Sequence, residues 1–397
     1  MQAAQKQNQN EKEPLAVFSE GPLFADAIPQ DAQELLNHFD AIISSTHPLN
    51  SKQRAQLPAV IRDLSHTLTD ERDRRRLGYM NRTETLSAYT HYFMWWNLLR
   101  LTKLFTPMQN FFNLDDDDVC IDFGSGPLTL PCALFLSRPE LRQKKLTWYC
   151  VDISGQALSI GENVFYTLAS KLGCEAWKII KVKGELGTAI RQKAKLVTSA
   201  NLFNEILQKE TMPLDYLAKK YSNTLLSYTQ KKDSRILVIE PGVPFSARFI
   251  SLLRSSFMRK KFMPVSPCTH CNQCPMEGKR GGKWCNFVFT TEDAPKALKK
   301  ISETAHLQKE RAVLSFVAVK EGLEEKENDE KITFRIASDS IRLPGKRQGF
   351  YACSNRGLIL AVTQTNLKSG ECYSLAIKEK KELPVDAKSG AFILNLD

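Results

Sequence analysis

The chain of 397 residues lacks any apolar run long enough to cross a bilayer. Its longest apolar stretch, YFMWWNLL at 92–99, contains Asn97 and falls far short of the ~20 residues that a spanning helix needs. The N-terminal segment also lacks the apolar run of a secretory signal and the arginines of a transit peptide, since the first arginine is Arg54. We therefore expect no membrane partner and a cytoplasmic, thiol-reducing location.

Acidic residues are fewer than basic ones, because 44 Asp and Glu stand against 55 Lys and Arg and leave a net charge of +11. This excess favours a polyanionic partner such as RNA. The ten cysteines, in a reducing compartment, argue against a disulfide framework and for a metal site or buried thiols. The length is too great for one ordinary core and predicts two or three domains.

No internal repeat is evident, and changes in residue pattern divide the chain into regions. We expect a disordered N-terminus at 1–20, a helical region at 21–114, an α/β domain at 115–320 with a Cys-rich insertion at 263–290, an acidic linker at 321–330 and a small β-rich, barrel-like domain at 331–397. Within the helical region, the apolar positions 35, 36, 39, 42 and 43 predict one amphipathic helix. The stretch 86–105 is apolar on most sides, so its aromatic residues are predicted to lie in the core.

The α/β domain is predicted from short apolar runs that alternate with helical stretches, as in a parallel sheet. The expected strands lie near 119–123, 146–151, 177–182, 195–200, 235–239 and 312–319.

The first chemical motif, VCIDFGSGPLTL at 119–130, places Asp122 at the end of a strand and Gly124 and Gly126 in the turn before a helix. Such a turn lets backbone N–H groups and a helix N-terminus approach a ligand closely. The next strand ends in Asp152, where a doubly wound fold positions a carboxylate to accept hydrogen bonds from a ribose diol. Together these features predict a nucleotide-type cofactor; the alternative is that Asp122 and the glycines only make the turn.

This arrangement resembles that of class I S-adenosylmethionine-dependent methyltransferases. The resemblance implies a Rossmann-like sheet in which Asp122, Gly124, Gly126 and Asp152 bind the cofactor, with the glycines along its methionine part and Asp152 at its ribose. Position 128 is Leu, where these enzymes commonly keep a small residue, and a leucine there would crowd the cofactor.

Further candidates follow the fourth and fifth strands, because strand ends line the crevice of this fold. Asn204 and Glu240 are predicted to contact the cofactor, with Glu205 and Pro241 as further candidates. For Glu205, a helix-start carboxylate favoured by the dipole is an equal alternative. The sequence lacks the Asn/Asp-Pro-Pro-aromatic signature for methylation of an exocyclic base nitrogen, and we identify no catalytic base.

The second motif is the cysteine-rich stretch SPCTHCNQCPMEGKRGGKWC at 266–285. Cys268, Cys271, Cys274 and Cys285 are dense enough to predict a metal or cluster, and thiolates suit zinc or iron–sulfur. Spacing alone does not decide between the two, and His270 is a further possible ligand.

The combined order of DFGSGP, NEI, EPG, PCTH, CP and WCNF, followed by a basic β-rich tail, resembles the Rsm-twenty-two family, as a bacterial member. These proteins are methyltransferase-like and associate with the small ribosomal subunit. The resemblance implies a 4Fe-4S cluster held by Cys268, Cys274, Cys285 and Cys353. Cys271 lies outside the family pattern and is the rival fourth ligand, which would make the metal site local.

Basic residues surround both arms of the expected cluster and predict contact with the RNA backbone. The candidates are Arg259, Lys260, Lys261, Lys279, Arg280, Lys283, Arg342, Lys346 and Arg347. The implied partner is the small ribosomal subunit with its rRNA, and we expect a monomer off the ribosome. The sequence leaves three functions open: an S-adenosylmethionine-dependent rRNA methyltransferase, a catalytically inert RNA-binding assembly factor, and a zinc-ribbon RNA-binding protein.

Overall fold

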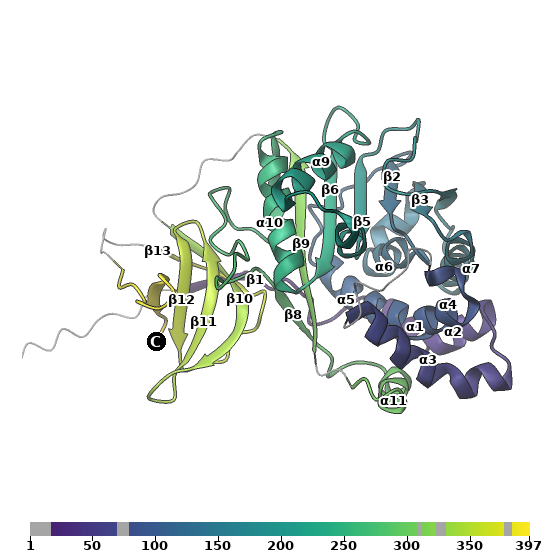
Figure 1. The fold of residues 1–397 in the computed structure, drawn as a ribbon, viewed down its shortest axis with the longest axis horizontal. Coiled ribbons are helices and arrows are strands. Elements are labelled where there is room, and N and C mark those ends of the chain that lie inside the picture. The colour runs from purple at the N-terminus through teal and green to yellow at the C-terminus, as the bar shows by residue number, and fades with distance from the viewer. Residues whose placement is uncertain (1–16, 70–78, 309–310, 323–330, 377–382) are drawn as a thin grey trace, which may run out of the picture.

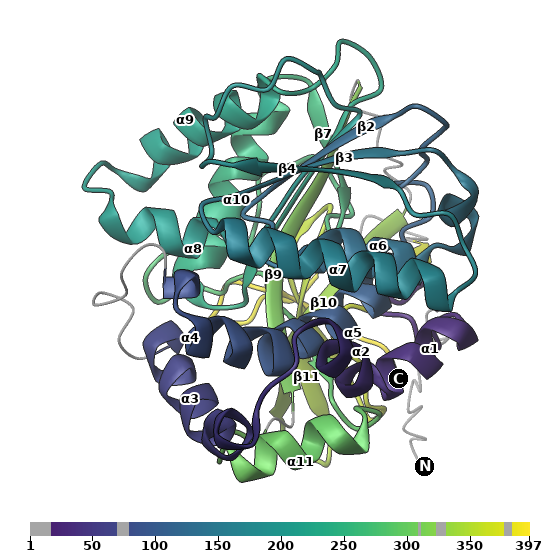
Figure 2. The same cartoon turned by 90° about the vertical axis from the view of Figure 1, so that its right-hand side faces the viewer.

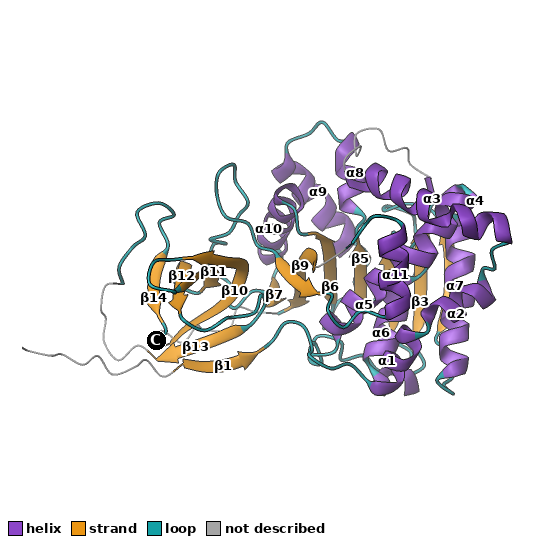
Figure 3. Cartoon of the chain, turned by 90° about the horizontal axis from the view of Figure 1, so that it is seen from below, coloured by secondary structure: helices purple, strands orange, loops and turns teal. Residues whose placement is uncertain are grey.

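A computed structural model describes residues 17–69, 79–308, 311–322, 331–376 and 383–397, which form an α/β unit and a smaller β-rich unit (Figure 1). The two units lie side by side, with the β-rich unit against β7 to β9 and α10 (Figure 3). None of the helices in these ranges has the length and apolar character that a membrane crossing requires.

The α/β unit is built on an eight-stranded sheet, and it contains all six strands predicted from the sequence. Five strands run parallel: β2 (Val119–Phe123), β3 (Thr147–Asp152), β4 (Lys178–Lys183), β5 (Leu196–Ala200) and β6 (Arg235–Pro241). β9 (Arg311–Glu321) pairs antiparallel with β6 and with β7 (Phe262–Ser266). The order is β4-β3-β2-β5-β6-β9-β7, so the chain reverses its direction of winding between β2 and β5.

Alternating side chains bury the two faces of this sheet under different helices. In β2, Cys120 faces the core that includes α6 (Thr129–Ser137) and α7 (Gly155–Lys171), whereas Ile121 and Phe123 face the core under α9 (Leu214–Leu226) and α10 (Pro244–Met258). The four residues of β2 that follow Val119 are all buried, and the burial of both faces explains the nearly continuous apolar sequence of this strand.

The N-terminal helices form a further layer outside α6 and α7 (Figure 2). They are α1 (Gln30–Asn37), α2 (Phe39–Thr46), α3 (Ser51–Thr69), the 3-10 turn η2 (Tyr79–Asn81), α4 (Thr83–Ala88), the π-helical turn η3 (Tyr89–Phe93) and α5 (Met94–Phe105). The single helix expected through position 43 is wrong, because His38 leaves the helical region at φ −121° and ψ 27° and separates α1 from α2. The apolar positions on both sides of that break still face one core.

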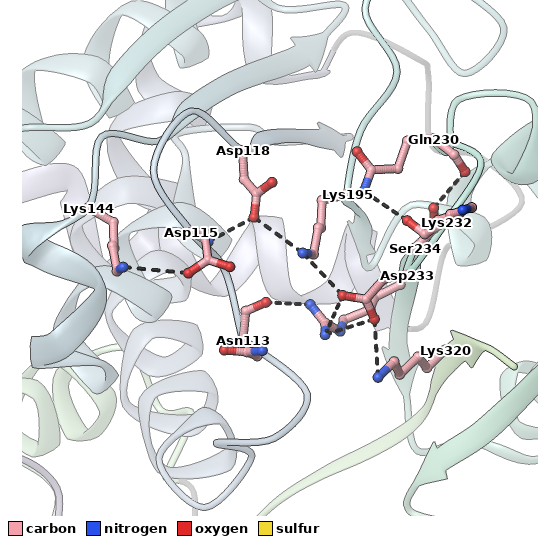
Figure 4. A network of polar contacts seen from close by, with 11 residues as sticks. Asn113, Asp115, Asp118, Lys144, Lys195, Gln230, Lys232, Asp233, Ser234 and Lys320 are labelled. Atoms are coloured by element: carbon pink, nitrogen blue, oxygen red, sulfur yellow. Dashed lines mark hydrogen bonds and ion pairs between the residues drawn. The ribbon is translucent and has the colours of Figure 1, made fainter.

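A network of ion pairs closes the end of the sheet where the parallel strands begin (Figure 4). Asp233 lies 3.1 Å from Lys195 and 3.1 Å from Lys320, and it also pairs with the buried Arg235 at 3.2 Å. Although burial opposes the shift, the lysines hold the pKa of Asp233 below its ordinary value. Charged groups therefore brace this end of the sheet, and the opposite end is left for the cavity described below.

The β-rich unit is a six-stranded sheet in the order β1-β13-β10-β11-β12-β14. Its strands are β1 (Val17–Gly21), β10 (Lys331–Arg342), β11 (Gln348–Ser354), β12 (Gly357–Thr363), β13 (Cys372–Ala376) and β14 (Phe392–Asn395). In the described part of the chain β1 and β14 are its edges. The expected disorder is wrong for residues 17–20, because these residues hydrogen-bond to β13 as an added strand; residues 1–16 lie outside the described ranges.

The cysteine-rich segment is continuous with the main sheet, although the sequence suggested a simple insertion. It leaves β7 and returns in β8 (Phe287–Thr290), and both strands pair with β9. Between them, the segment reaches the β-rich unit, where Arg335 of β10 donates to the carbonyl oxygen of Pro267 at 2.7 Å. Most of the expected acidic linker, residues 323–330, lies outside the described ranges.

Candidate functional site

The glycine turn after β2 is shaped by backbone conformations that favour glycine. Gly124 has φ 69° and Gly126 has φ 51°, both in the left-handed region. A Cβ atom on Gly124 would lie 3.0 Å from the Leu202 side chain, so the turn is also tightly packed. Both glycines line a cavity, as the sequence predicted for a cofactor-binding turn.

Asp122 lies beneath this turn and is not among the residues that line the cavity. Its carboxylate accepts hydrogen bonds from the hydroxyl groups of Ser125 at 2.6 Å and Thr198 at 2.7 Å. Burial raises the pKa of Asp122 to about 7, against the effect of these two donors. Asp122 thus supports the turn from inside the protein, and its predicted contact with the cofactor stays a prediction.

Asp152 joins the turn after β2 to the turn after β3. One carboxylate oxygen accepts a hydrogen bond from the Gly126 N–H at 2.9 Å, and the other accepts one from the Ser154 N–H at 2.8 Å. Burial raises the pKa of Asp152, while the two N–H donors oppose that shift. Because Asp152 also lines the cavity, it both fixes the glycine turn and presents a carboxylate to a ligand.

Glu240 at the end of β6 is fully buried and binds neighbouring backbone, and its predicted contact with the cofactor stays a prediction. Its two carboxylate oxygens accept hydrogen bonds from the N–H groups of Phe203 at 2.8 Å and Asn204 at 2.9 Å. It thus holds the start of α8 (Phe203–Ile206) and does not line the cavity. The predicted candidates Asn204, Glu205 and Pro241 do line it.

Leu128 does not crowd the cavity, contrary to the expectation from its size. It begins α6 with φ 57°, is fully buried in the main core and is absent from the cavity lining. The adjoining backbone packs directly on α7, since a Cβ atom on Gly161 would lie 2.3 Å from the carbonyl carbon of Pro127. The leucine side chain therefore points into the protein and leaves the cavity open.

The cavity has a volume of about 730 Å³ and lies at the carboxyl ends of the parallel strands. This volume is typical of a site for a small molecule or cofactor. One wall comes from the N-terminal helices, including aromatic residues of 86–105 that were predicted to lie in the core. The lining residues from that layer include Met80, Tyr89, Phe93, Asn97 and Arg100. Their signal in the sequence was the polar pair Asn97 and Arg100 within a mostly apolar helix.

The cysteine-rich segment brings thiols from both units together. Cys268 follows β7, Cys274 lies in the segment, Cys285 precedes β8, and Cys353 belongs to β11. Burial raises the pKa of the Cys353 thiol well above its ordinary value, and the charges of Cys274, Cys268 and Cys285 add to the shift. This electrostatic coupling shows that the four thiols predicted from the family pattern face one region. No disulfide joins cysteines among the residues described.

Two further side chains surround these thiols. The Arg254 Nε donates to the Cys268 Sγ at 3.2 Å, and its Nη2 donates to the His270 carbonyl oxygen at 2.7 Å. The His270 Nε2 lies 3.1 Å from the Cys353 Sγ, and burial followed by the Arg254 charge lowers the pKa of His270 to about 4. Within the described ranges, no three His, Cys, Asp or Glu side chains are close enough to hold a single metal ion.

The basic candidates fall into three groups, all outside the cavity. The first group, Arg259, Lys260 and Lys261, follows α10. The second group, Lys279, Arg280 and Lys283, lies in the cysteine-rich segment, and the third, Arg342, Lys346 and Arg347, lies at the end of β10 and in the turn to β11. All are exposed except Lys283, whose ammonium group lies 4.0 Å from the centre of the Tyr351 ring. β11 separates the β10–β11 turn from Cys353 by roughly 20 Å, because strands rise about 3.3 Å per residue. The group formed by Arg342, Lys346 and Arg347 therefore lies away from Cys353.

The strand order and the cavity define a class I methyltransferase-like protein. Residues 119–381 match the family model described as mitochondrial small ribosomal subunit Rsm22, and the chain belongs to this family. It is therefore a methyltransferase-like member of a ribosome-associated family. The bacterial origin and cytoplasmic location expected from the sequence stay predictions.

Several solved methyltransferase structures are similar to the chain at low identity. Magnesium protoporphyrin IX methyltransferase from Synechocystis PCC 6803 is 10% identical, covering 67% of this chain and 100% of that one, with a TM-score of 0.35. Precorrin-6y C5,15-methyltransferase from Geobacter metallireducens is 9% identical (55% and 88% covered, TM-score 0.33), and a SAM-dependent methyltransferase from Geobacter sulfurreducens is 12% identical (54% and 88%, TM-score 0.31). No curated protein matches the sequence.

Proposed function

We propose that the protein binds S-adenosylmethionine in the cavity and uses it to methylate RNA of the small ribosomal subunit. The observation that carries the proposal is Asp152, whose carboxylate fixes the Gly126 turn and also faces a cavity of about 730 Å³. In such folds a carboxylate at the end of this strand accepts hydrogen bonds from the ribose diol of a nucleotide-type cofactor, and we assign this role to Asp152. The family supplies the ribosomal partner.

Methyl transfer from cofactor labelled in its methyl group to isolated small-subunit RNA tests the proposal directly. We expect label in the RNA that depends on the wild-type protein and is lost when Asp152 is replaced by Ala. Calorimetry with S-adenosylmethionine on the same samples measures binding separately. A wild-type protein that binds no cofactor would contradict the proposal.

A second function is an assembly factor that binds the cofactor and RNA without transferring the methyl group. It is favoured because carboxylates that line the cavity already accept hydrogen bonds from the protein. A carboxylate held in this way is a poorer proton acceptor for catalysis. Asp152 accepts two backbone N–H groups, and Glu210 accepts the Tyr221 hydroxyl at 2.5 Å and the Lys220 ammonium group at 2.9 Å. Cofactor binding without any labelled RNA would favour this second function.

We also propose that Cys268, Cys274, Cys285 and Cys353 hold a 4Fe-4S cluster. The coupling of their four thiols supports this donor set, and thiolates are the ligands of such clusters. When bound, the cluster would supply a covalent connection between the two units.

Anaerobic purification tests the cluster. We expect a brown protein with broad visible absorption and about four irons per chain, as the proposed cluster requires. A colourless protein that contains zinc would contradict the cluster and favour a zinc-binding RNA-binding protein. We further propose that the protein is monomeric off the ribosome, which light scattering after size-exclusion chromatography would test.

A further inference from the structure

The cavity wall formed by the N-terminal layer carries a buried cation. Arg100 of α5 lines the cavity and is only 7% exposed. Burial lowers the pKa of Arg100 to about 10, which leaves the guanidinium protonated at neutral pH. A buried charge is costly unless it is paired and hydrogen-bonded, so the partners of this side chain decide its role.

Those partners leave the guanidinium incompletely satisfied. Its Nη2 donates to the Asn97 Oδ1 at 2.8 Å and its Nη1 donates weakly to the Val313 carbonyl oxygen at 3.4 Å. Its Nε is buried and has no hydrogen-bond partner among the residues that the structure describes. Glu240 contributes a favourable charge, but its two oxygens already accept the N–H groups of Phe203 and Asn204.

We propose that Arg100 binds the carboxylate of the amino-acid part of S-adenosylmethionine, an inference that rests on the proposed cofactor site. The carboxylate is the one anionic group of this cofactor at neutral pH, since its sulfonium and ammonium groups are cationic. A guanidinium presents a planar set of N–H donors that matches a carboxylate. Asn97 holds the guanidinium in place and prevents it from rotating away from the ligand.

Calorimetry with two ligands tests this assignment. S-adenosylhomocysteine carries the carboxylate, whereas 5′-methylthioadenosine keeps the adenosine and sulfur but lacks the amino-acid part. For Arg100→Met we expect affinity for S-adenosylhomocysteine to fall by about 10- to 150-fold, the range for charge-assisted hydrogen bonds, with methylthioadenosine changed less than about twofold. Arg100→Lys should recover part of the loss, because it restores the charge without the planar donors.

The methylthioadenosine measurement also shows whether the variant keeps a folded cavity. Equal losses for both ligands, or no loss for either, would overturn the carboxylate assignment while the cofactor site stands. A loss confined to binding of a short RNA would assign Arg100 to a backbone phosphate and overturn it as well. If wild-type protein binds neither adenosyl ligand, the proposed function fails and the assignment fails with it.

Discussion

The cavity and the cysteine cluster are assembled in different ways. The cavity is built mainly from turns that follow strands of one sheet, and Asp152 joins two of these turns by accepting backbone N–H groups from both. The cysteine cluster draws on both sheets, and burial together with the charges of neighbouring thiols raises the pKa values of Cys285 and Cys353. A ligand in the cavity therefore occupies a site that the fold already holds, whereas a metal at the thiols would add to the stability of the fold itself.

The largest effect is expected from Cys353→Ser, because this change removes the thiol contributed by the β-rich unit. We expect loss of most bound iron and a decrease in unfolding free energy on the order of 5 kcal/mol, as for loss of a metal site. Iron analysis and thermal unfolding of anaerobic protein measure the two effects.

Two matched variants give this test its controls. Cys271→Ser removes the rival ligand and should keep the iron, and Cys372→Ser removes another buried thiol of the same sheet without touching the proposed set. Full iron retention in Cys353→Ser together with loss in Cys271→Ser would reverse the ligand assignment. The connection between the units would then not depend on the metal.

Asp122 gives a pH test of the floor of the cavity. Its folded pKa is raised to about 7 from an ordinary value of 3.8, so between these pH values the folded protein retains a proton that the unfolded chain has lost. The contribution to stability is complete below about pH 4 and is lost as the pH rises through about 7, with a slope of at most about 1.4 kcal/mol per pH unit. Asp122→Asn has no proton to lose and should flatten this part of the profile.

Chemical unfolding of both proteins at several pH values between about 4 and 8 measures this difference. Comparing the two profiles removes the titration of other groups, which both proteins share. Parallel profiles for wild type and Asp122→Asn would show that Asp122 is already ionised across this range, held by its Ser125 and Thr198 donors.

Asp152→Ala is expected to weaken both the glycine turn and cofactor binding. It leaves the N–H groups of Gly126 and Ser154 without their acceptor, and each unsatisfied group costs about 1–3 kcal/mol. We expect cofactor affinity to fall by about 100-fold, the equivalent of about 2.7 kcal/mol. Calorimetry measures the loss, and Asp152→Asn, which keeps one acceptor oxygen, should lose less. Unchanged affinity in Asp152→Ala would show that the turn is held without it.

The two regions also differ in how far the sequence predicted them. The strands, the glycine turn and Asp152 were predicted because each depends on residues close together in the chain. The roles of Asp122 and Glu240 were not, because side-chain direction at a strand end decides between the cavity and the core. The wall containing Tyr89 and Arg100 depends on how the N-terminal layer packs on the sheet, which no local pattern specifies. For the cysteines, family resemblance supplied the long-range partner that spacing left open.

The smallest effect is expected at the basic residues of the cysteine-rich segment. Two adjacent residues there, Lys279 and Arg280, differ in whether an acidic side chain pairs with them. Lys279 pairs with Glu277, so part of its charge is neutralised within the protein, whereas Arg280 is exposed and has no ion pair among the described residues. If this segment contacts RNA, Arg280→Ala should reduce the slope of log affinity against log salt by about 0.7 per lost phosphate contact, and Lys279→Ala by less. Filter binding to small-subunit RNA at several salt concentrations measures the slopes, with exposed Lys52 of α3 replaced by Ala as the control. Equal slopes for Arg280→Ala and Lys52→Ala would show that RNA does not contact Arg280. The RNA contact would then lie outside this part of the cysteine-rich segment.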